Sequence, residues 1–165
     1  MHPRGRKSVD EIQSSDEFGT VSGFSAFNAP ATIARAALDA IVAHAREAGP
    51  AECCGLLLGT GSSIAEAART KNIADDPSSR FVVDPKDHID GCRSARKRGL
   101  EVVGFYHSHP RSPAVPSATD CAEAGYPGHV YLIVSLWQEP PEVGLFRLDR
   151  ADAGNFLRLP FVTVG

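Results

Sequence analysis

The stretch that decides how this chain folds is an apolar run that ends in polar residues: Val102-Val103-Gly104-Phe105-Tyr106-His107-Ser108-His109-Pro110, followed by Pro116-Ser117-Ala118-Thr119-Asp120. Residues i and i+2 of a strand point to the same face, so a strand that continues through His109 places both imidazoles on one side. A loop interrupted by prolines can then bring Asp120 back to them. The pattern predicts a metal site with two nitrogen ligands and one oxygen ligand.

A ligand set of this kind suits zinc. Zinc in proteins is usually four-coordinate, and a catalytic zinc keeps one position open for water, whereas a structural zinc is closed by protein ligands. Two histidines and one aspartate leave that position open. We therefore expect one zinc ion per chain, held by His107, His109 and Asp120, in a site built for hydrolysis.

The same residues also have a purely structural interpretation. Ser117 followed by Asp120 is a near match to a helix capping box, in which the two side chains bond each other's backbone N–H groups. His107 and His109 could simply end a strand, because a histidine pair at this spacing is by itself a weak signal for a metal. The two interpretations of Asp120 are compatible, since a helix start favours the ionised carboxylate that a metal requires.

Glu52 lies upstream, in Pro50-Ala51-Glu52-Cys53-Cys54-Gly55-Leu56-Leu57-Leu58-Gly59. With it, the chain resembles the JAMM/MPN+ zinc metalloproteases, and most of all their compact prokaryotic JAB-type members. The resemblance extends from about Thr32 to the C-terminus. It implies that the two histidines and the aspartate hold the zinc, that Glu52 acts as general base and acid, and that Ser117 hydrogen-bonds the oxyanion.

Hydrolysis of an amide independently requires a residue such as Glu52. A carboxylate that is not a metal ligand must take a proton from water and deliver it to the leaving amine. Taken alone, Glu52 would be an ordinary solvated residue between a helix and a strand, and the histidine pattern favours the catalytic role instead. Capping and catalysis both require a hydroxyl at Ser117, so the sequence leaves open whether it serves one or both.

Composition indicates a single globular domain. The chain has 165 residues, 42% of them hydrophobic, and a formal net charge of −3, which suffices for one well-buried core. We expect residues 1–30 to be a flexible polar segment and residues 31–165 to be the metalloprotease domain. The mild acidity favours no nucleic-acid partner. Because the sequence has no long apolar stretch, we expect no segment to span a membrane. Because it has no signal-peptide pattern, we expect a cytoplasmic location. The oligomeric state stays open.

The four cysteines, Cys53, Cys54, Cys92 and Cys121, form no CxxC pair and should stay reduced inside a cell. We expect most of them to be small core residues. A zinc site that includes a cysteine, or a cysteine nucleophile paired with a histidine, is the alternative. Neighbouring strand residues face opposite sides, so Cys53 and Cys54 would make a poor pair of ligands.

Hydrophobic periodicity and turn signals predict the elements around the motif. A first helix is expected from about Ala31 to Ala48, and Gly49-Pro50 stops it. A second helix should begin at Asp84-Pro85 and end at Gly99, and a third should begin at Ser117. Strands are expected at residues 53–58, 64–70, 81–83, 102–109, 129–136 and 143–148, with a last short strand within 157–164.

Strands that alternate with two or three helices predict an α/β or α+β fold. The resemblance to the JAMM/MPN+ proteases favours α/β: a single domain in which a mixed β-sheet is flanked by helices. This JAMM/MPN fold is akin to that of the cytidine deaminases.

Three functions are compatible with these observations. The resemblance implies a zinc-dependent peptidase or isopeptidase that acts at the C-terminus of a ubiquitin-like or sulfur-carrier protein, with a small β-grasp protein that ends in Gly-Gly as the expected substrate. A zinc hydrolase of a non-peptide amide or amidine bond, such as a nucleobase deaminase, would use an HxE and a CxxC, which the chain lacks. A catalytically silent MPN-type scaffold that binds protein partners would typically lose ligands, whereas all five positions are present here.

Overall fold

The computed structural model describes residues 29–149, 151, 152 and 154–165. Apart from its last two residues, the expected flexible segment 1–30 lies outside this part of the chain, and the expected domain limits stay a prediction. Within the described part, an eight-stranded mixed sheet has the order β7-β6-β5-β4-β2-β3-β1-β8. The strands are β1 (Ala31–Ala34), β2 (Cys54–Thr60), β3 (Ser63–Thr70), β4 (Glu101–His109), β5 (Val130–Ser135), β6 (Glu142–Leu148), β7 (Phe156–Leu159) and β8 (Phe161–Val164).

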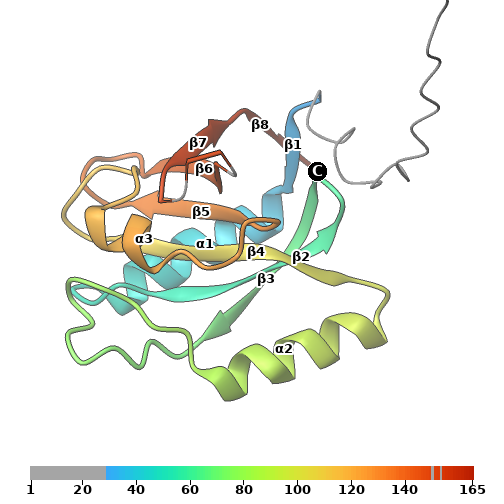
Figure 1. Cartoon of the computed structure of the whole chain (residues 1–165), viewed down its shortest axis with the longest axis horizontal. Coiled ribbons are helices and arrows are strands. Elements are labelled where there is room, and N and C mark those ends of the chain that lie inside the picture. Colours follow the sequence, from blue (N-terminus) through green and yellow to red (C-terminus); the bar gives the residue numbers. More distant parts are fainter. Residues whose placement is uncertain (1–28, 150, 153) are drawn as a thin grey trace, which may run out of the picture.

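Helices pack on both faces of this sheet (Figure 1). Helix α1 (Arg35–Ala48) buries Ile41 in a core cluster that includes Leu57 and Tyr106. Helix α2 (Pro85–Lys97) contributes Ala95 to a second cluster that includes Leu56 and Phe105. Because successive strand residues point to opposite faces, the continuous apolar run of β2 supplies both clusters. The expected α/β architecture, a mixed sheet flanked by helices, is confirmed.

Strand register brings the polar motifs to one end of the sheet. Strands β2 and β4 are antiparallel with Cys54 opposite His107, and β4 and β5 are parallel with His107 beside Ile133. Alternation along β4 puts Phe105, His107 and His109 on the face that α2 covers, while Tyr106 packs with α1 on the other face. Both histidines therefore project from the same side of a central strand, as the i, i+2 spacing predicts.

The prediction of the first helix is wrong for its first four residues. Residues Ala31–Ala34 form β1, which pairs in parallel with both β3 and β8. Ile33 is completely buried there, and α1 begins only at Arg35. The partners of β1 lie far along the chain, so local helical periodicity could not reveal them.

Two other expected strands also differ. Residues 81–83 form no strand, and a single bridge joins Val83 to Asn72. The last expected strand is two strands, β7 and β8, which Pro160 separates and which lie at opposite ends of the sheet order. Proline lacks the N–H that a continuous ladder needs, and the single-residue link means that the sheet curls strongly between its edges.

The remaining expectations are confirmed within a residue or two. Helix α2 has Asp84 as N-cap, whose side chain accepts from the N–H of Lys86, and Pro85 is its first residue. The third helix, α3, spans Ala118–Glu123 after Ser117. No helix in the described part of the chain is long and apolar enough to cross a membrane.

Candidate metal centre

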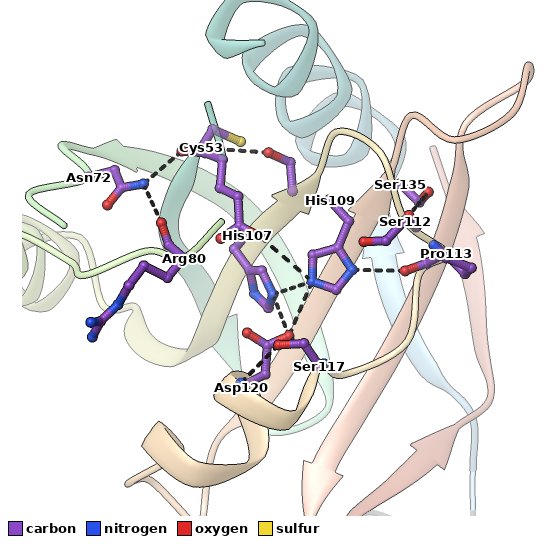
Figure 2. Close-up of polar contacts among 12 residues, drawn as sticks. Cys53, Asn72, Arg80, His107, His109, Ser112, Pro113, Ser117, Asp120 and Ser135 are labelled. Carbon is purple, nitrogen blue, oxygen red and sulfur yellow. Dashed lines mark hydrogen bonds and ion pairs between the residues drawn. The ribbon is translucent and has the colours of Figure 1, made fainter. Parts of the chain in front are cut away.

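Strand β4 and helix α3 bring three metal-type ligand atoms together (Figure 2). Nε2 of His107 and Nε2 of His109 lie 3.1 Å apart, and each lies 3.1 Å from Oδ2 of Asp120. All three side chains are nearly inaccessible to solvent, with exposed fractions of 2%, 3% and 8%. The sequence pattern thus corresponds to a compact triangle of two nitrogens and one oxygen.

The triangle fits a cation better than it fits hydrogen bonds alone. Nδ1 of His109 lies 2.8 Å from the carbonyl oxygen of Pro113, and because a carbonyl only accepts, Nδ1 carries a proton. When the His109 ring is neutral, its Nε2 therefore carries no proton, and its lone pair faces the carboxylate oxygen of Asp120 and the Nε2 atom of His107. A bound cation relieves that repulsion at all three atoms. Their spacing is also close to the roughly 3.3 Å that separates two ligands in a tetrahedral site with bonds of about 2.0 Å.

The protonation states of these side chains also favour metal binding. Burial lowers the pKa of His107, which favours the neutral imidazole that binds metals. Burial alone would raise the pKa of Asp120, but hydrogen bonds with both histidines and with the N–H of Ser117 hold it well below its usual range. The carboxylate is therefore ionised. Burial also opposes protonation of His109, although Asp120 and the Pro113 carbonyl outweigh it and raise the pKa of His109.

Ser117 and Asp120 form the expected capping box at the start of α3. Oγ of Ser117 accepts from the N–H of Asp120 at 3.0 Å, and the N–H of Ser117 donates to Oδ2 of Asp120 at 2.8 Å. Because this Oδ2 also faces both histidines, the helix start orients the ligand atom. The helix cap is confirmed, while the oxyanion role of Ser117 stays a prediction.

Glu52 lies beside the triangle. Extending the β2–β4 register by two residues from the pair Cys54–His107 puts Glu52 opposite His109. Oε1 of Glu52 is 4.0 Å from Nε2 of His109, and Oε2 is buried without a hydrogen-bond partner among the described residues. Glu52 is only 6% exposed, so the alternative of an ordinary solvated glutamate is wrong. Burial raises its pKa to about 7, with His109 opposing and Asp120 adding to the rise.

Comparison with known proteins identifies the family. Residues 34–149 match the family described as prokaryotic homologs of the JAB domain. The chain belongs to this family. The JAB domain is 41% identical over 110 residues to a desampylase of Haloferax volcanii, and the alignment covers 63% of the chain and 79% of the relative. It is 34% identical over 99 residues to a CysO-cysteine peptidase of Mycobacterium tuberculosis, with 59% of the chain and 68% of that relative covered.

A solved structure has a similar fold. The solution structure of a protein from Desulfitobacterium hafniense matches with a TM-score of 0.72 at 30% identity, and the match covers 81% of this chain and 92% of that one. The family resemblance expected from the sequence is confirmed by the match to the family model and by the similarity to the desampylase.

Asn72 is a residue of the JAB domain that the sequence did not single out. Its Nδ2 donates to the backbone carbonyls of Glu52, at 3.0 Å, and of Arg80, at 3.1 Å. Its Oδ1 accepts from the N–H groups of Ala74, at 3.1 Å, and of Val82, at 3.0 Å. One side chain thus joins the 72–83 segment to the backbone of Glu52. Figure 2 shows Asn72 and its bond to Arg80. Nothing in the local pattern separates it from any other asparagine in a loop.

Two further residues support the site. The ring of Phe81 stacks on that of His107, with centroids 4.3 Å apart and planes inclined by 22°. Ser108, fully buried on the opposite side of β4, accepts with its Oγ from the N–H of Cys53 at 2.8 Å. The central serine of the motif therefore holds the chain next to Glu52. The position of Ser108 between the two histidines was the one sequence feature that could have indicated its supporting role.

The cysteines lie outside the triangle. All four are free thiols; Cys53 and Cys54 are buried as expected, whereas Cys92 and Cys121 are only partly buried. Burial raises the pKa of Cys53 and of Cys54 to about 11, so both stay protonated thiols at neutral pH. Protonated thiols are poor nucleophiles and poor ligands, which weighs against the cysteine alternatives at these two positions.

Proposed function

We propose that this JAB domain is a zinc-dependent metallopeptidase that hydrolyses a peptide or isopeptide bond at the C-terminus of a ubiquitin-like or sulfur-carrier protein. The observation that carries the proposal is the buried carboxylate of Glu52, 4.0 Å from Nε2 of His109 and beside the three ligand atoms. The similarity to a desampylase and to a CysO-cysteine peptidase supports the same class of reaction.

One zinc ion per chain is proposed to bind His107, His109 and Asp120. Zinc would supply Lewis-acid chemistry there: it polarises the scissile carbonyl and makes a nucleophile available from water near neutral pH. The chain orients the ligands, because Pro113 holds the His109 ring and the N–H of Ser117 holds the carboxylate of Asp120.

Glu52 is proposed as general base and then general acid. It would take a proton from the attacking water and deliver it to the leaving amine, and a pKa of about 7 before zinc binds is consistent with a group that can do both. Ser117 accepts the N–H of Asp120 with its Oγ, which leaves its hydroxyl proton to donate to the oxyanion.

The segments beside the centre are short. The connection from β3 to α2 spans residues 71–84, and that from α3 to β5 spans residues 124–129, which leaves little room to grip a folded ubiquitin chain. A small β-grasp protein whose extended Gly-Gly tail enters the site is the proposed substrate. A cytoplasmic location stays a prediction.

The test combines metal analysis with a substrate panel. Purified wild-type protein and the Glu52→Gln variant should each contain about one zinc, and His107→Ala and Asp120→Ala should lose it. Wild type should cleave fusions in which a β-grasp protein ending in Gly-Gly precedes a reporter, whereas Glu52→Gln should not. Wild type without metal would overturn the site assignment. Zinc without cleavage of any fusion would favour the MPN-type scaffold.

A further inference from the structure

A cavity of about 290 Å³ opens beside the candidate metal centre. Side chains of His107 and Asp120 form part of its wall, so it lies directly next to the position of the reacting carbonyl. The rest of the lining is mostly apolar and rich in aromatic rings: Arg80, Phe81, Val82, Val83, Phe105, Pro116, Glu123, Ala124, Tyr126, Tyr131, Ile133 and Phe156. Its volume is at the small end of ligand pockets, which suits one side chain.

The floor of this cavity is rigid. Phe105, Tyr131 and Ile133 come from the central strands β4 and β5 and are 5%, 7% and 1% exposed. The centroid of the Tyr131 ring lies 5.8 Å from that of the Phe105 ring and 5.2 Å from that of the Phe156 ring. Because these side chains are held by the core, the cavity exists before any substrate binds, and its preferred occupant is a hydrocarbon group.

Apart from Asp120 of the candidate metal centre, the charged lining residues are Arg80 and Glu123, whose side chains are 40% and 42% exposed and so lie at the rim. Arg80 forms an ion pair with Glu123 across the segments that border the cavity. Nε of Arg80 is buried and has no hydrogen-bond partner among the described residues. In Figure 2, Arg80 lies on the side of His107 opposite to His109. The charged pair of Arg80 and Glu123 therefore stays at the edge of the cavity, while the interior can take an apolar chain.

The part of the substrate that fills the cavity can be inferred from the proposed function, and this inference rests on that function. A Gly-Gly tail carries no side chain at the two residues before the scissile bond, so it cannot fill an apolar cavity next to the reacting carbonyl. The leaving amine is the other group at that position. We infer that the cavity receives the hydrocarbon chain carried by the leaving amine, and that it makes the enzyme selective for this side of the bond. The chain is either the side chain of an α-linked residue or the methylene stem of an isopeptide-linked lysine.

Two substrate series test the inference. In the first, a β-grasp protein ending in Gly-Gly is joined through an α-peptide bond to a residue that is glycine, alanine, leucine or phenylalanine. In the second, the Gly-Gly carboxyl is joined to the side-chain amine of lysine or of its homologue with a single methylene. Burial of the chain should raise kcat/KM about 10- to 100-fold from the shortest to the longest member of at least one series, and that series identifies the source.

A matched pair of variants ties the selectivity to the cavity. Ala124→Leu adds a side chain to the lining, and Ala122→Leu adds the same side chain to an exposed position of α3 outside it. Ala124→Leu should reduce the ratio of kcat/KM between long-chain and short-chain substrates toward one, and Ala122→Leu should keep the wild-type ratio. Because a ratio is compared, a general loss of folded protein does not imitate the result.

The outcomes separate the inference from the proposed function. Cleavage of every substrate at similar kcat/KM would overturn the inference and leave the peptidase assignment intact. So would a preference that instead follows the residue before Gly-Gly. If zinc-loaded wild type cleaves no member of either series, both the proposed function and the inference are overturned.

Discussion

Nδ2 of Asn72 donates to the backbone carbonyl oxygen of Glu52 at 3.0 Å, across twenty residues of sequence. The N–H of Glu52 is also bonded, to the carbonyl of Pro77 at 2.7 Å. Both bonds come from the 72–83 segment, which through Phe81 also stacks on the ring of His107. One loop therefore positions the proposed general base and one proposed ligand together.

The variant Asn72→Asp should lower kcat about 10- to 100-fold while zinc content stays near one per chain. Aspartate keeps the acceptor for Ala74 and Val82 but loses the two donated bonds to Glu52 and Arg80. Steady-state kinetics with metal analysis check this. Gln138→Glu, the same amide-to-carboxylate exchange at an exposed position, serves as the control for added charge. Wild-type kcat in Asn72→Asp would show that the bond to Glu52 is dispensable.

The free energy of unfolding of metal-free Glu52→Gln, relative to that of metal-free wild type, should be higher at pH 8 than at pH 5. Burial raises the pKa of Glu52 to about 7 in the folded chain, whereas an unfolded glutamate titrates near 4.3. As pH rises from about 4 to 7, the unfolded state ionises first, so wild type loses stability and the full loss is present above pH 7. The difference should reach about 1–3 kcal/mol.

Urea unfolding of both proteins in a chelator, at the two pH values, gives this difference directly. Other titrating groups are common to the pair and cancel. An equal difference at pH 5 and pH 8 would contradict a raised Glu52 pKa.

Substitution of Ser117 should separate capping from catalysis. Ser117→Ala removes the acceptor for the N–H of Asp120 and should cost about 1 kcal/mol of stability together with about 100-fold or more in kcat. Ser117→Asp keeps a capping oxygen but has no hydroxyl proton, so stability should recover and activity should not. Thermal unfolding and kinetics of the two variants are compared with Ser117→Thr, which retains both functions. Full activity in Ser117→Asp would rule out the oxyanion role.

Removal of zinc should destabilise the protein reversibly. A ligand that binds only the native state stabilises it by mass action, by about 4 kcal/mol at a thousandfold excess over Kd. Addition of a chelator should therefore lower the thermal midpoint of wild type, and zinc should restore it. His107→Ala, which lacks one proposed ligand, provides the reference and should not respond to either addition. If neither the chelator nor zinc changes the thermal midpoint of wild type, this would argue against a metal at this centre.

Tyr106→Phe should change stability without changing the metal centre. The hydroxyl of Tyr106 shares a 2.8 Å hydrogen bond with Nδ1 of His44 in the α1-side core, and its loss should cost about 1 kcal/mol. Tyr106 immediately precedes His107 but projects from the opposite face of β4. Zinc content and kcat should stay at wild-type values. A change in zinc affinity would mean that the two faces are coupled.

Several features of the molecule were predictable because they depend on neighbours in sequence. The i, i+2 spacing of His107 and His109 follows from strand alternation alone. The capping box of Ser117 and Asp120 and the start of α2 at Asp84-Pro85 follow from local hydrogen bonding. The proximity of Glu52 was expected only through the family resemblance.

Contacts between distant parts of the chain decided the rest. Ala31–Ala34 is a strand only because β3 and β8 lie on either side of it, and the roles of Asn72 and Phe81 exist only where their loop meets Glu52 and His107. The apolar cavity is likewise built from residues of separate elements. The sequence by itself determined which side chains could bind a metal, because ligand spacing is a local property of strand and cap. Only the tertiary structure decided what surrounds them, because burial, pKa and cavity shape arise from packing between elements far apart in the chain.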